Sequence, residues 1–167
     1  IHPRIRLNVE CDLTMNLYDR FKKGAFDLVL VKMSRPEDFP HGVEIWSEPL
    51  VWVGKKDYFP KNEDMLPLVL SPQPCVYRAS ALEALERAGK PWRMVFTSTS
   101  YAGMIAAVKA GLGVTVLPET MVPETLDFLT HMPLPSLPDI HVSLLKQEGK
   151  NDCLLTLAEF LLQKLKQ

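Results

Sequence analysis

A thiol, a phenol and a guanidinium stand within four positions of one another, at Cys75, Tyr77 and Arg78. They follow a proline-rich turn, Ser71–Pro74, at the point where the sequence pattern predicts that a helix begins. A thiol at a helix N-terminus can have a lowered pKa and act as a nucleophile or a metal ligand. A guanidinium binds carboxylates and phosphates. The segment could therefore be a catalytic site, a metal site, the rim of a ligand site or ordinary packing.

Catalysis and metal binding both need partners that the sequence does not offer. A reactive cysteine needs a base and an orienting group, and no Gly-x-Ser-x-Gly nucleophile elbow occurs. The three cysteines and four histidines show no spacing typical of metal ligands. We therefore expect no enzyme activity, no metal and no cofactor, and we interpret Cys75 as a small buried contact. A ligand-facing or redox-sensing thiol stays open as the alternative, and a catalytic thiol is a more distant one. The histidines lie in or beside predicted loops and strand edges, at His2, His41, His131 and His141.

Arg78 has two interpretations that the sequence leaves open. It can be a solvated charge in the first turn of the predicted helix. Cations are mildly unfavourable at that end of a helix, so a specific role is equally favoured. That role would be pairing with a carboxylate or an anionic ligand.

Hydroxyl side chains mark two further predicted helix starts. Thr99 and Ser100 precede an apolar helical pattern, and Thr14 opens another, where Ser or Thr is most often an N-cap. Lys32 directly follows the apolar run Phe26–Val31, which predicts a strand buried on both faces of a parallel sheet. Strand carboxyl ends and helix N-termini gather at one edge of a parallel sheet and favour anions there. We therefore predict one cleft faced by Thr14, Lys32, Ser71, Cys75 and Ser100.

Strands and helices alternate along the chain, which predicts an α/β fold with parallel sheets covered by helices. Prolines near Glu48-Pro49 and Leu137-Pro138 are expected to break the chain so that a middle segment is inserted into an outer one. Helices are predicted from Thr14 to before Gly24, over Tyr77–Ala88, from Ser100 to before Gly111, and over Leu154–Lys166. Strands are predicted over Arg4–Glu10, Phe26–Val31, Val43–Lys56, Leu68–Leu70, Trp92–Ser98, Val114–Pro118 and His141–Lys146.

The composition bounds the class of protein. The chain has 167 residues, 47% of them hydrophobic, which suits one compact domain or two small lobes. The net charge of −1 and the lack of a dense basic cluster argue against strong nucleic-acid binding by this chain. No apolar run reaches the length of a membrane span, and no signal peptide is recognisable. An odd number of scattered cysteines favours reduced thiols in a cytoplasm.

The glycine-rich segment Ala110–Pro118 follows a predicted helix and precedes a predicted strand. A dinucleotide-binding loop has the opposite order, strand before helix. We therefore interpret Gly111 and Gly113 as a helix stop and a tight reversal, not as a nucleotide site.

Three segments together resemble the effector-binding domain of LysR-type transcriptional regulators. They are "HPRIRLNVECDLTMNLYDRFKKGAFDLVLV", "EPLVWVGKKDYFP" and "AAVKAGLGVTVLPE". The internal segment from Cys75 to Pro118 looks more specifically like the LrhA/HexA-like subgroup, in which a Cys-x-Tyr-Arg element is followed by Pro-Trp-Arg and Thr-Ser-x-Ser. The resemblance spans nearly the whole chain, and the order and spacing of its parts make it specific.

The resemblance implies a two-lobed, type 2 periplasmic-binding-protein-like fold with a small effector between the lobes, and a carboxylate is the class of effector that we expect. Lobe I would comprise residues 1–49 and 140–167, and lobe II residues 50–139. The family domain normally begins with a strand and a helix before "HPRIRL", and neither is in this sequence. The family also implies a cytoplasmic bacterial regulator that assembles into dimers or tetramers through this domain. It would bind DNA only through an N-terminal winged helix-turn-helix domain absent from this chain, and no membrane.

Residue roles follow from the same resemblance. The effector-binding positions would be Thr14, Lys32, Ser71, Cys75, Val76, Arg78, Thr99 and Ser100. The crossings between lobes would be hinges at Glu48, Pro49, Ile140 and His141. The alternative function is a stand-alone solute-binding protein of the same fold, followed by an enzyme that uses Cys75.

Overall fold

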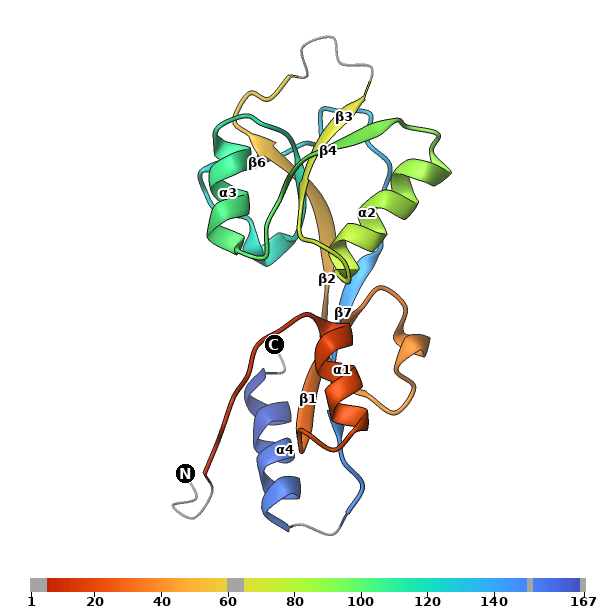
Figure 1. Ribbon diagram of the computed structural model, residues 1–167, viewed down its shortest axis with the longest axis vertical. Helices are drawn as coiled ribbons and strands as arrows, with labels where there is room; N and C mark the ends of the chain where they lie inside the picture. Colours follow the sequence, from red (N-terminus) through yellow and green to blue (C-terminus); the bar gives the residue numbers. More distant parts are fainter. Residues whose placement is uncertain (1–5, 60–64, 150–151, 166–167) are drawn as a thin grey trace. The chain divides into compact units, whose positions relative to one another are not determined.

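The computed structural model describes residues 6–59, 65–149 and 152–165. Contacts divide the chain into two compact units: unit 1 comprises residues 1–47 and 141–167, and unit 2 comprises residues 48–140. Two strands run from one unit into the other, β2 (Val43–Lys55) and β7 (Asp139–Lys146), and they are neighbours in one sheet (Figure 1). Because both crossings are strands, the unit boundary falls within regular structure rather than in loops.

Unit 1 places a helix, α1 (Thr14–Lys22), against β1 (Leu28–Met33) (Figure 1). Phe21 of α1 and the β1 side chains Val29 and Val31 share a hydrophobic core with Leu145 of β7. A second, smaller core joins Ile45 and Leu144 to the C-terminal helix α4 (Asp152–Leu165), which buries Ala158 there. A short 3-10 turn, η1 (Pro36–Asp38), connects β1 to β2. The helical pattern of α4 is confirmed, although Lys166 lies outside the described residues.

The predicted parallel, doubly buried strand in unit 1 is wrong. β1 pairs antiparallel with β7, from Leu28 opposite Lys146 to Met33 opposite His141. Its burial alternates, and Leu30 is 39% exposed between buried neighbours. An uninterrupted apolar run cannot distinguish the two cases, because a strand covered on one face can also carry apolar residues on the other.

The predicted strand over Arg4–Glu10 does not form in the described part of the segment, residues 6–10. Leu7 and Val9, which alternate with polar residues as in a half-buried strand, are 65% and 70% exposed. A strand is stable only when neighbouring strands satisfy its backbone and cover one face. The described residues provide no such partner for residues 6–10. Arg4, Ile5 and His2 lie outside the described residues.

Unit 2 contains the parallel strands that the sequence predicts. β3 (Leu66–Leu70) pairs in parallel with β4 (Trp92–Thr97), and its Leu68 makes a parallel bridge to Val114. The helices α2 (Val76–Arg87) and α3 (Tyr101–Lys109) lie on either side of this pair (Figure 1). Leu68 and Leu70 join the core with Leu85 of α2, whereas Val69 joins the core with Val108 of α3. Alternate side chains of β3 therefore face opposite helices, which explains why all five residues are buried.

The rest of unit 2 is antiparallel, so the expectation of wholly parallel sheets is wrong. β2 pairs with β5 (Thr115–Pro118) and with a short strand that the sequence did not predict, β6 (Leu126–Phe128). A second 3-10 turn, η2 (Glu119–Met121), follows β5. The strand is not interrupted at Glu48-Pro49 as expected, because β2 continues through it, but the boundary between the two units does fall at this point. Pro49 directly precedes the register with β5, which begins at Leu50, so its missing N–H removes no bond from that ladder.

Gly111 and Gly113 have the structural roles expected of them. Gly111 has a φ of 81°, in the left-handed region, and ends α3 after the C-cap Ala110. Gly113 lies where the chain passes closely over Pro67, and a Cβ at this position would be only 2.5 Å from the Pro67 carbonyl oxygen. The segment is thus a reversal between a helix and a strand. None of the helices in the described ranges combines the length and the apolar character needed to cross a bilayer.

Candidate functional site

The turn between β3 and α2 carries the cysteine that opened the sequence analysis. The Gln73–Pro74 peptide bond is cis, and Cys75 occupies the N-cap position of α2, which begins at Val76 rather than at Tyr77. The Cys75 thiol is half-buried and free, and it makes no capping hydrogen bond. The side chain of the N-cap residue therefore does not bind the first-turn N–H groups of α2.

The Arg78 side chain, in the first turn of α2, contacts the backbone of the preceding turn between β3 and α2. Its Nη1 donates a hydrogen bond to the carbonyl oxygen of Ser71 at 3.1 Å, and the same nitrogen is 4.0 Å from Sδ of Met94. Its Nε is buried and has no acceptor among the described residues. The interpretation of Arg78 as a freely solvated charge is therefore wrong. The guanidinium is a partly buried cation that bonds the backbone of the turn at Ser71.

The start of α3 lies beside the same turn. Ser100 is the N-cap of α3, and its hydroxyl oxygen accepts a hydrogen bond from the N–H of Gly103 at 3.2 Å, as predicted. The Ser71 hydroxyl donates to Sδ of Met104, one turn into α3, at 3.5 Å. Ser71 therefore contacts both helices that follow the parallel strands, α2 through Arg78 and α3 through Met104. Thr99 is exposed beside this helix start.

In unit 1 the structure brings Thr14 and Lys32 together, with two corrections. Leu13, not Thr14, is the N-cap of α1, and Thr14 is the first residue of the helix. Lys32 lies within β1 rather than after it, opposite Val142. The Lys32 N–H donates to the Thr14 hydroxyl oxygen at 3.1 Å. The hydroxyl thus links the helix to the strand, which a pattern of local caps could not reveal because the two residues are distant in sequence.

Asp12 is a charged residue at this helix start that the sequence analysis missed. Its carboxylate accepts hydrogen bonds from the Asn16 side-chain amide at 3.0 Å and from the Leu13 N–H at 2.7 Å. The bond from Asn16, then the bond from Leu13, lower the pKa of the Asp12 carboxyl below its ordinary value. A sequence signal could have identified Asp12. It lies two residues before the helix, and an Asn follows it four positions later.

Three of the four predicted hinge residues have contacts within their own unit. Both the N–H and the hydroxyl of Thr120, in η2, donate to one carboxylate oxygen of Glu48, at 3.1 and 2.6 Å. Ile140 is buried in the core of unit 2. His141, in unit 1, places Nδ1 2.7 Å from a carboxylate oxygen of Glu44. Glu48 and Ile140 are thus held within unit 2, and His141 contacts the other crossing strand within unit 1.

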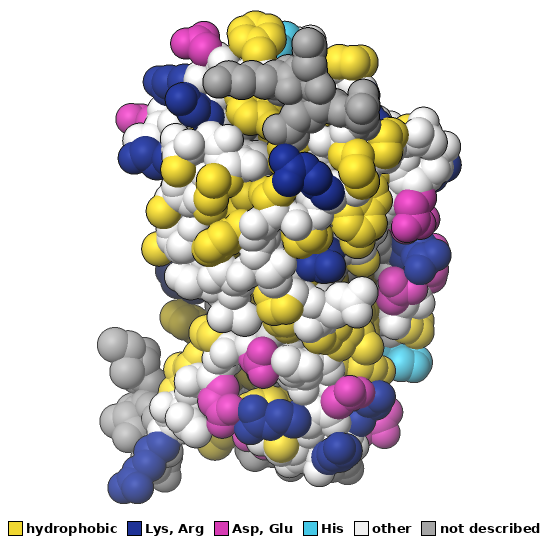
Figure 2. Space-filling model, turned by 45° about the horizontal axis from the view of Figure 1, so that its top comes forward, with side chains coloured by type: hydrophobic (Ala, Val, Ile, Leu, Met, Phe, Trp, Pro, Cys, Tyr) yellow, Lys and Arg dark blue, Asp and Glu magenta, His cyan; other side chains and the backbone are white. Residues whose placement is uncertain are grey.

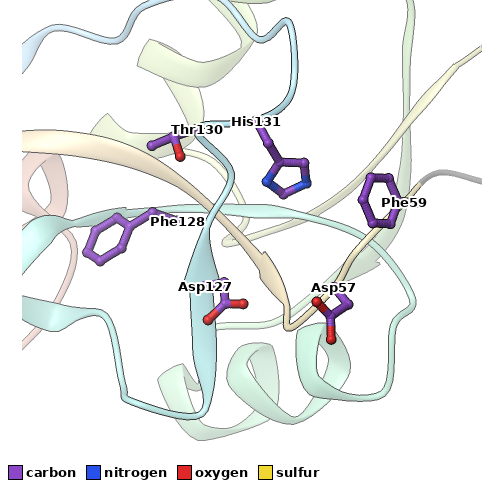
Figure 3. A pocket seen from close by; sticks show the side chains of 6 residues that line it. All are labelled: Asp57, Phe59, Asp127, Phe128, Thr130 and His131. Carbon is purple, nitrogen blue, oxygen red and sulfur yellow. The ribbon is translucent and has the colours of Figure 1, made fainter.

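A cavity of about 410 Å³ lies in unit 2 at a different place. In Figure 3 the side chains of Asp57, Asp127, His131 and Phe59 surround its centre. Its lining consists of Asp57, Phe59, Asp127, Phe128, Thr130 and His131, which include none of the predicted site residues. The sequence did not predict this cavity, because its walls come from two segments that are about seventy positions apart and carry no recognisable motif.

Basic side chains and potential metal ligands have the following distribution in the described part of the chain. On the face shown in Figure 2, basic side chains are spread among acidic and hydrophobic ones instead of forming a continuous basic surface. Within the described ranges, no three His, Cys, Asp or Glu side chains group in a way that could hold a metal ion.

Comparisons with known proteins give the family. The profile of the LysR substrate binding domain matches residues 2–166. The HTH-type transcriptional regulator DgdR of Burkholderia cepacia is 35% identical over 158 residues, covering 94% of this chain and 53% of DgdR. The regulator PecT of Dickeya dadantii is 34% identical over 140 residues, covering 83% of this chain and 44% of PecT. The chain thus spans about half the length of these relatives.

Solved structures show the same fold at low sequence identity. The apo regulatory domain of HypT from Salmonella typhimurium superposes with a TM-score of 0.80 at 14% identity, over 99% of this chain and 85% of that one. The regulatory domain of CcmR from Synechocystis, in complex with 2-PG, superposes with a TM-score of 0.76 at 18% identity, over 99% and 86%. The predicted family is confirmed, and with it a regulatory domain rather than an enzyme. The chain belongs to the LysR substrate binding domain family, whose members are the effector-binding regulatory domains of LysR-type transcriptional regulators.

Proposed function

We propose that this chain senses a small-molecule effector on behalf of a cytoplasmic bacterial transcription regulator whose DNA-binding part lies outside the sequence. The relatives that support this are both HTH-type regulators about twice as long as the region that they share with this chain. Among proteins of the same fold, CcmR was solved with 2-PG and QuiR with shikimate, each in its regulatory or effector-binding domain. A site for a small anionic metabolite is therefore the proposal for this chain as well.

The observation that carries the proposal is the position of Ser71, which contacts both α2 and α3 near their N-terminal ends. Backbone N–H groups at helix starts favour an anion. We assign unit 2 the contacts from Ser71, Cys75, Val76, Arg78, Thr99 and Ser100, and unit 1 those from Thr14 and Lys32.

The hydroxyl chemistry of the site favours a ligand group that only accepts hydrogen bonds. The oxygens of Thr14 and Ser100 already accept a backbone N–H each, from Lys32 and Gly103. A hydroxyl that accepts in this way still has its own proton to donate. An ionised carboxylate is an acceptor-only group, so it would use both protons. Lys32 and Arg78 are the candidates for balancing its charge.

The regulatory step would be a shift between two lobe arrangements. An effector that binds one arrangement more tightly increases its population. The hinges would be Glu48, Pro49, Ile140 and His141, where β2 and β7 pass between the units. Dimers or tetramers formed through this domain would transmit the shift to the DNA-binding parts.

Two finer features of the resemblance belong to the same proposal. The Cys75-Val76-Tyr77-Arg78 element and the Thr-Ser-x-Ser element support placement in the LrhA/HexA-like subgroup. The exposed alternating side chains of Leu7 and Val9 support a strand and a helix, outside this sequence, that complete unit 1. Hydrogen exchange of the whole protein tests the second point: slow exchange at residues 6–10 supports it, and exchange at the rate of an unstructured peptide contradicts it.

A thermal-shift screen tests the sensing function. The whole protein is heated with shikimate and a panel of small carboxylates, and each carboxylate is paired with its uncharged amide. A ligand at about 100 times its Kd stabilises by roughly 2.7 kcal/mol, which raises Tm by several degrees. We expect the carboxylate to raise Tm and its amide not to.

Variants of the whole protein then locate the site. Ser100→Ala and Lys32→Ala should abolish the ligand-induced rise in Tm. Their matched controls, Thr156→Ala and Lys90→Ala, should retain it, because the Thr156 hydroxyl bonds the Asp152 carbonyl within α4 and the Lys90 amine bonds the Pro133 carbonyl. A rise that persists in both site variants would place the ligand elsewhere. No rise with any carboxylate would leave a domain that assembles the regulator without sensing one.

A further inference from the structure

Two thioether sulfurs lie beside hydrogen-bond donors at the turn between β3 and α2. The Ser71 hydroxyl is 3.5 Å from Sδ of Met104, and Nη1 of Arg78 is 4.0 Å from Sδ of Met94. A thioether is a weak acceptor, so neither donor gains much from its sulfur. Each of the two donors therefore faces a sulfur atom that accepts only a weak hydrogen bond.

The guanidinium of Arg78 has donor capacity that the described residues do not satisfy. Nη1 bonds the Ser71 carbonyl oxygen, whereas Nε is buried and has no acceptor there. A buried donor without an acceptor is unfavourable, and more so on a charged group. An oxygen on the Met94 sulfur would lie beside Nη1, the nitrogen that contacts this sulfur, and would accept a charge-assisted hydrogen bond from the guanidinium.

We propose that Met94 is an oxidation site and that Arg78 binds the oxygen of its sulfoxide. The co-reactant is a two-electron oxidant such as hypochlorous acid or hydrogen peroxide. The sulfur lone pair attacks the oxidant's oxygen, so an S–O bond forms while the O–Cl or O–O bond breaks. Sulfur loses two electrons, and the oxidant leaves as chloride and a proton, or as water. Methionine sulfoxide is reducible by dedicated reductases, so the modification is reversible.

Met94 combines access with a cationic donor. It is half-buried on β4 and thus more exposed than Met104, which is only 9% exposed. Met121 is 37% exposed and will also be oxidised. In the described part of the chain, however, the guanidinium–thioether contact is at Met94. What distinguishes Met94 is thus the stabilisation of the product rather than exposure.

Oxidation would act on the turn itself. A sulfoxide oxygen is a stronger acceptor than a thioether, and Nη1 has two N–H donors, so it can bind the sulfoxide and keep its bond to the Ser71 carbonyl. The additional bond would hold the segment from Ser71 to Val76 more firmly against β4. This consequence rests on the proposed function, since that segment is assigned to the effector site, but the oxidation site does not.

The test is a thermodynamic cycle on the purified whole protein. Wild type and Arg78→Leu are each measured reduced and after treatment with hypochlorous acid, and peptide mass spectrometry records the sulfoxide at each methionine. Oxidation should lower the Tm of Arg78→Leu by roughly 3–8 °C more than it lowers that of wild type, because its Met94 sulfoxide has no donor. In a Met94→Leu background this difference should vanish, while the sulfoxides at exposed methionines remain.

Each alternative outcome has a definite meaning. Equal losses of Tm in wild type and Arg78→Leu would overturn the proposal, as would Met94 staying reduced when Met121 is fully oxidised. Should Arg78→Leu not fold, Arg78→Lys serves in its place, since a lysine amine cannot present the same planar set of donors. No effector is used, so failure here is independent of failure in the ligand screen.

Discussion

The N–H of Lys32 on β1 donates a hydrogen bond to the hydroxyl oxygen of Thr14 on α1, at 3.1 Å. The two residues are eighteen positions apart, and their bond is partly buried. It connects the first turn of α1 to a strand of the same unit, and it fixes the orientation of a hydroxyl that we assign to the effector site. The same bond therefore contributes to both the stability and the proposed recognition chemistry of unit 1.

Thr14→Val removes the acceptor while keeping the shape of the side chain. The Lys32 N–H then loses this acceptor at a partly buried position, which should cost about 1–3 kcal/mol. Urea denaturation of the protein without ligand measures the loss. Thr14→Ser keeps the hydroxyl and should lose less than half as much. Equal losses in the two variants would show that the methyl group, not the hydrogen bond, matters at this position.

Two substitutions of Ser100 distinguish its role as a helix cap from its proposed role in ligand binding. Ser100→Ala removes the cap that accepts from the Gly103 N–H, at a cost of about 1 kcal/mol. Ser100→Asp supplies another acceptor for the same N–H and should keep the wild-type Tm, but its charge repels a carboxylate ligand. We expect Ser100→Asp to retain stability and to lose the thermal shift with the ligand found in the screen. An unchanged thermal shift in Ser100→Asp would show that the ligand does not approach α3.

The sequence predicted the elements of unit 2 better than those of unit 1, for a physical reason. The buried run Leu66–Leu70 and the helices that cover it are adjacent in sequence, so local patterns contain most of the information. Val29 and Val31 are buried in one cluster with Phe21 and Leu145. Leu145 is far away in the sequence, so no local pattern indicates that it covers these two valines. The antiparallel pairing of β1 with β7 joins segments more than one hundred positions apart, and it was predicted incorrectly.

The sequence predicted which residues belong to the candidate site, but not which hydrogen bonds they make. Ser100 was identified as a cap from its position before an apolar helical pattern, and its bond to Gly103 confirms it. Thr14 was assigned the same role from the same kind of pattern, yet its hydroxyl serves Lys32. Arg78 was left between two roles, because only the fold brings it to the Ser71 carbonyl. A helix cap can be predicted from residues that are neighbours in the sequence, whereas a hydrogen bond between two different elements cannot.

Gly113 is predicted to tolerate no side chain. A Cβ there would lie 2.5 Å from the carbonyl oxygen of Pro67, which accepts the N–H of Val114. Gly113→Ala must therefore displace the contact between β3 and the segment before β5, at a cost of about 3 kcal/mol or more. Gly24→Ala is the control: its φ of +76° strains any side chain, but no atom lies within 4 Å of the new Cβ, so about 1–2 kcal/mol is expected. Equal denaturation midpoints for the two variants would refute the close approach at Gly113.

The segment before α1 should respond to acid through Glu10. Arg20 Nη1 donates to the Glu10 carboxylate at 2.7 Å, and this hydrogen bond lowers the pKa of Glu10 below its ordinary value of 4.5. A lowered pKa means that the contact stabilises the folded state above about pH 4.5, and that this contribution is lost as the pH falls through the lowered pKa. Arg20→Met should raise the pKa of Glu10 back toward 4.5, as measured by an NMR titration of its carboxyl carbon. Arg35→Met should leave it unchanged, since that guanidinium contacts Asp38. If Glu10 titrates identically in wild type and Arg20→Met, the segment is not held to α1 by this pair.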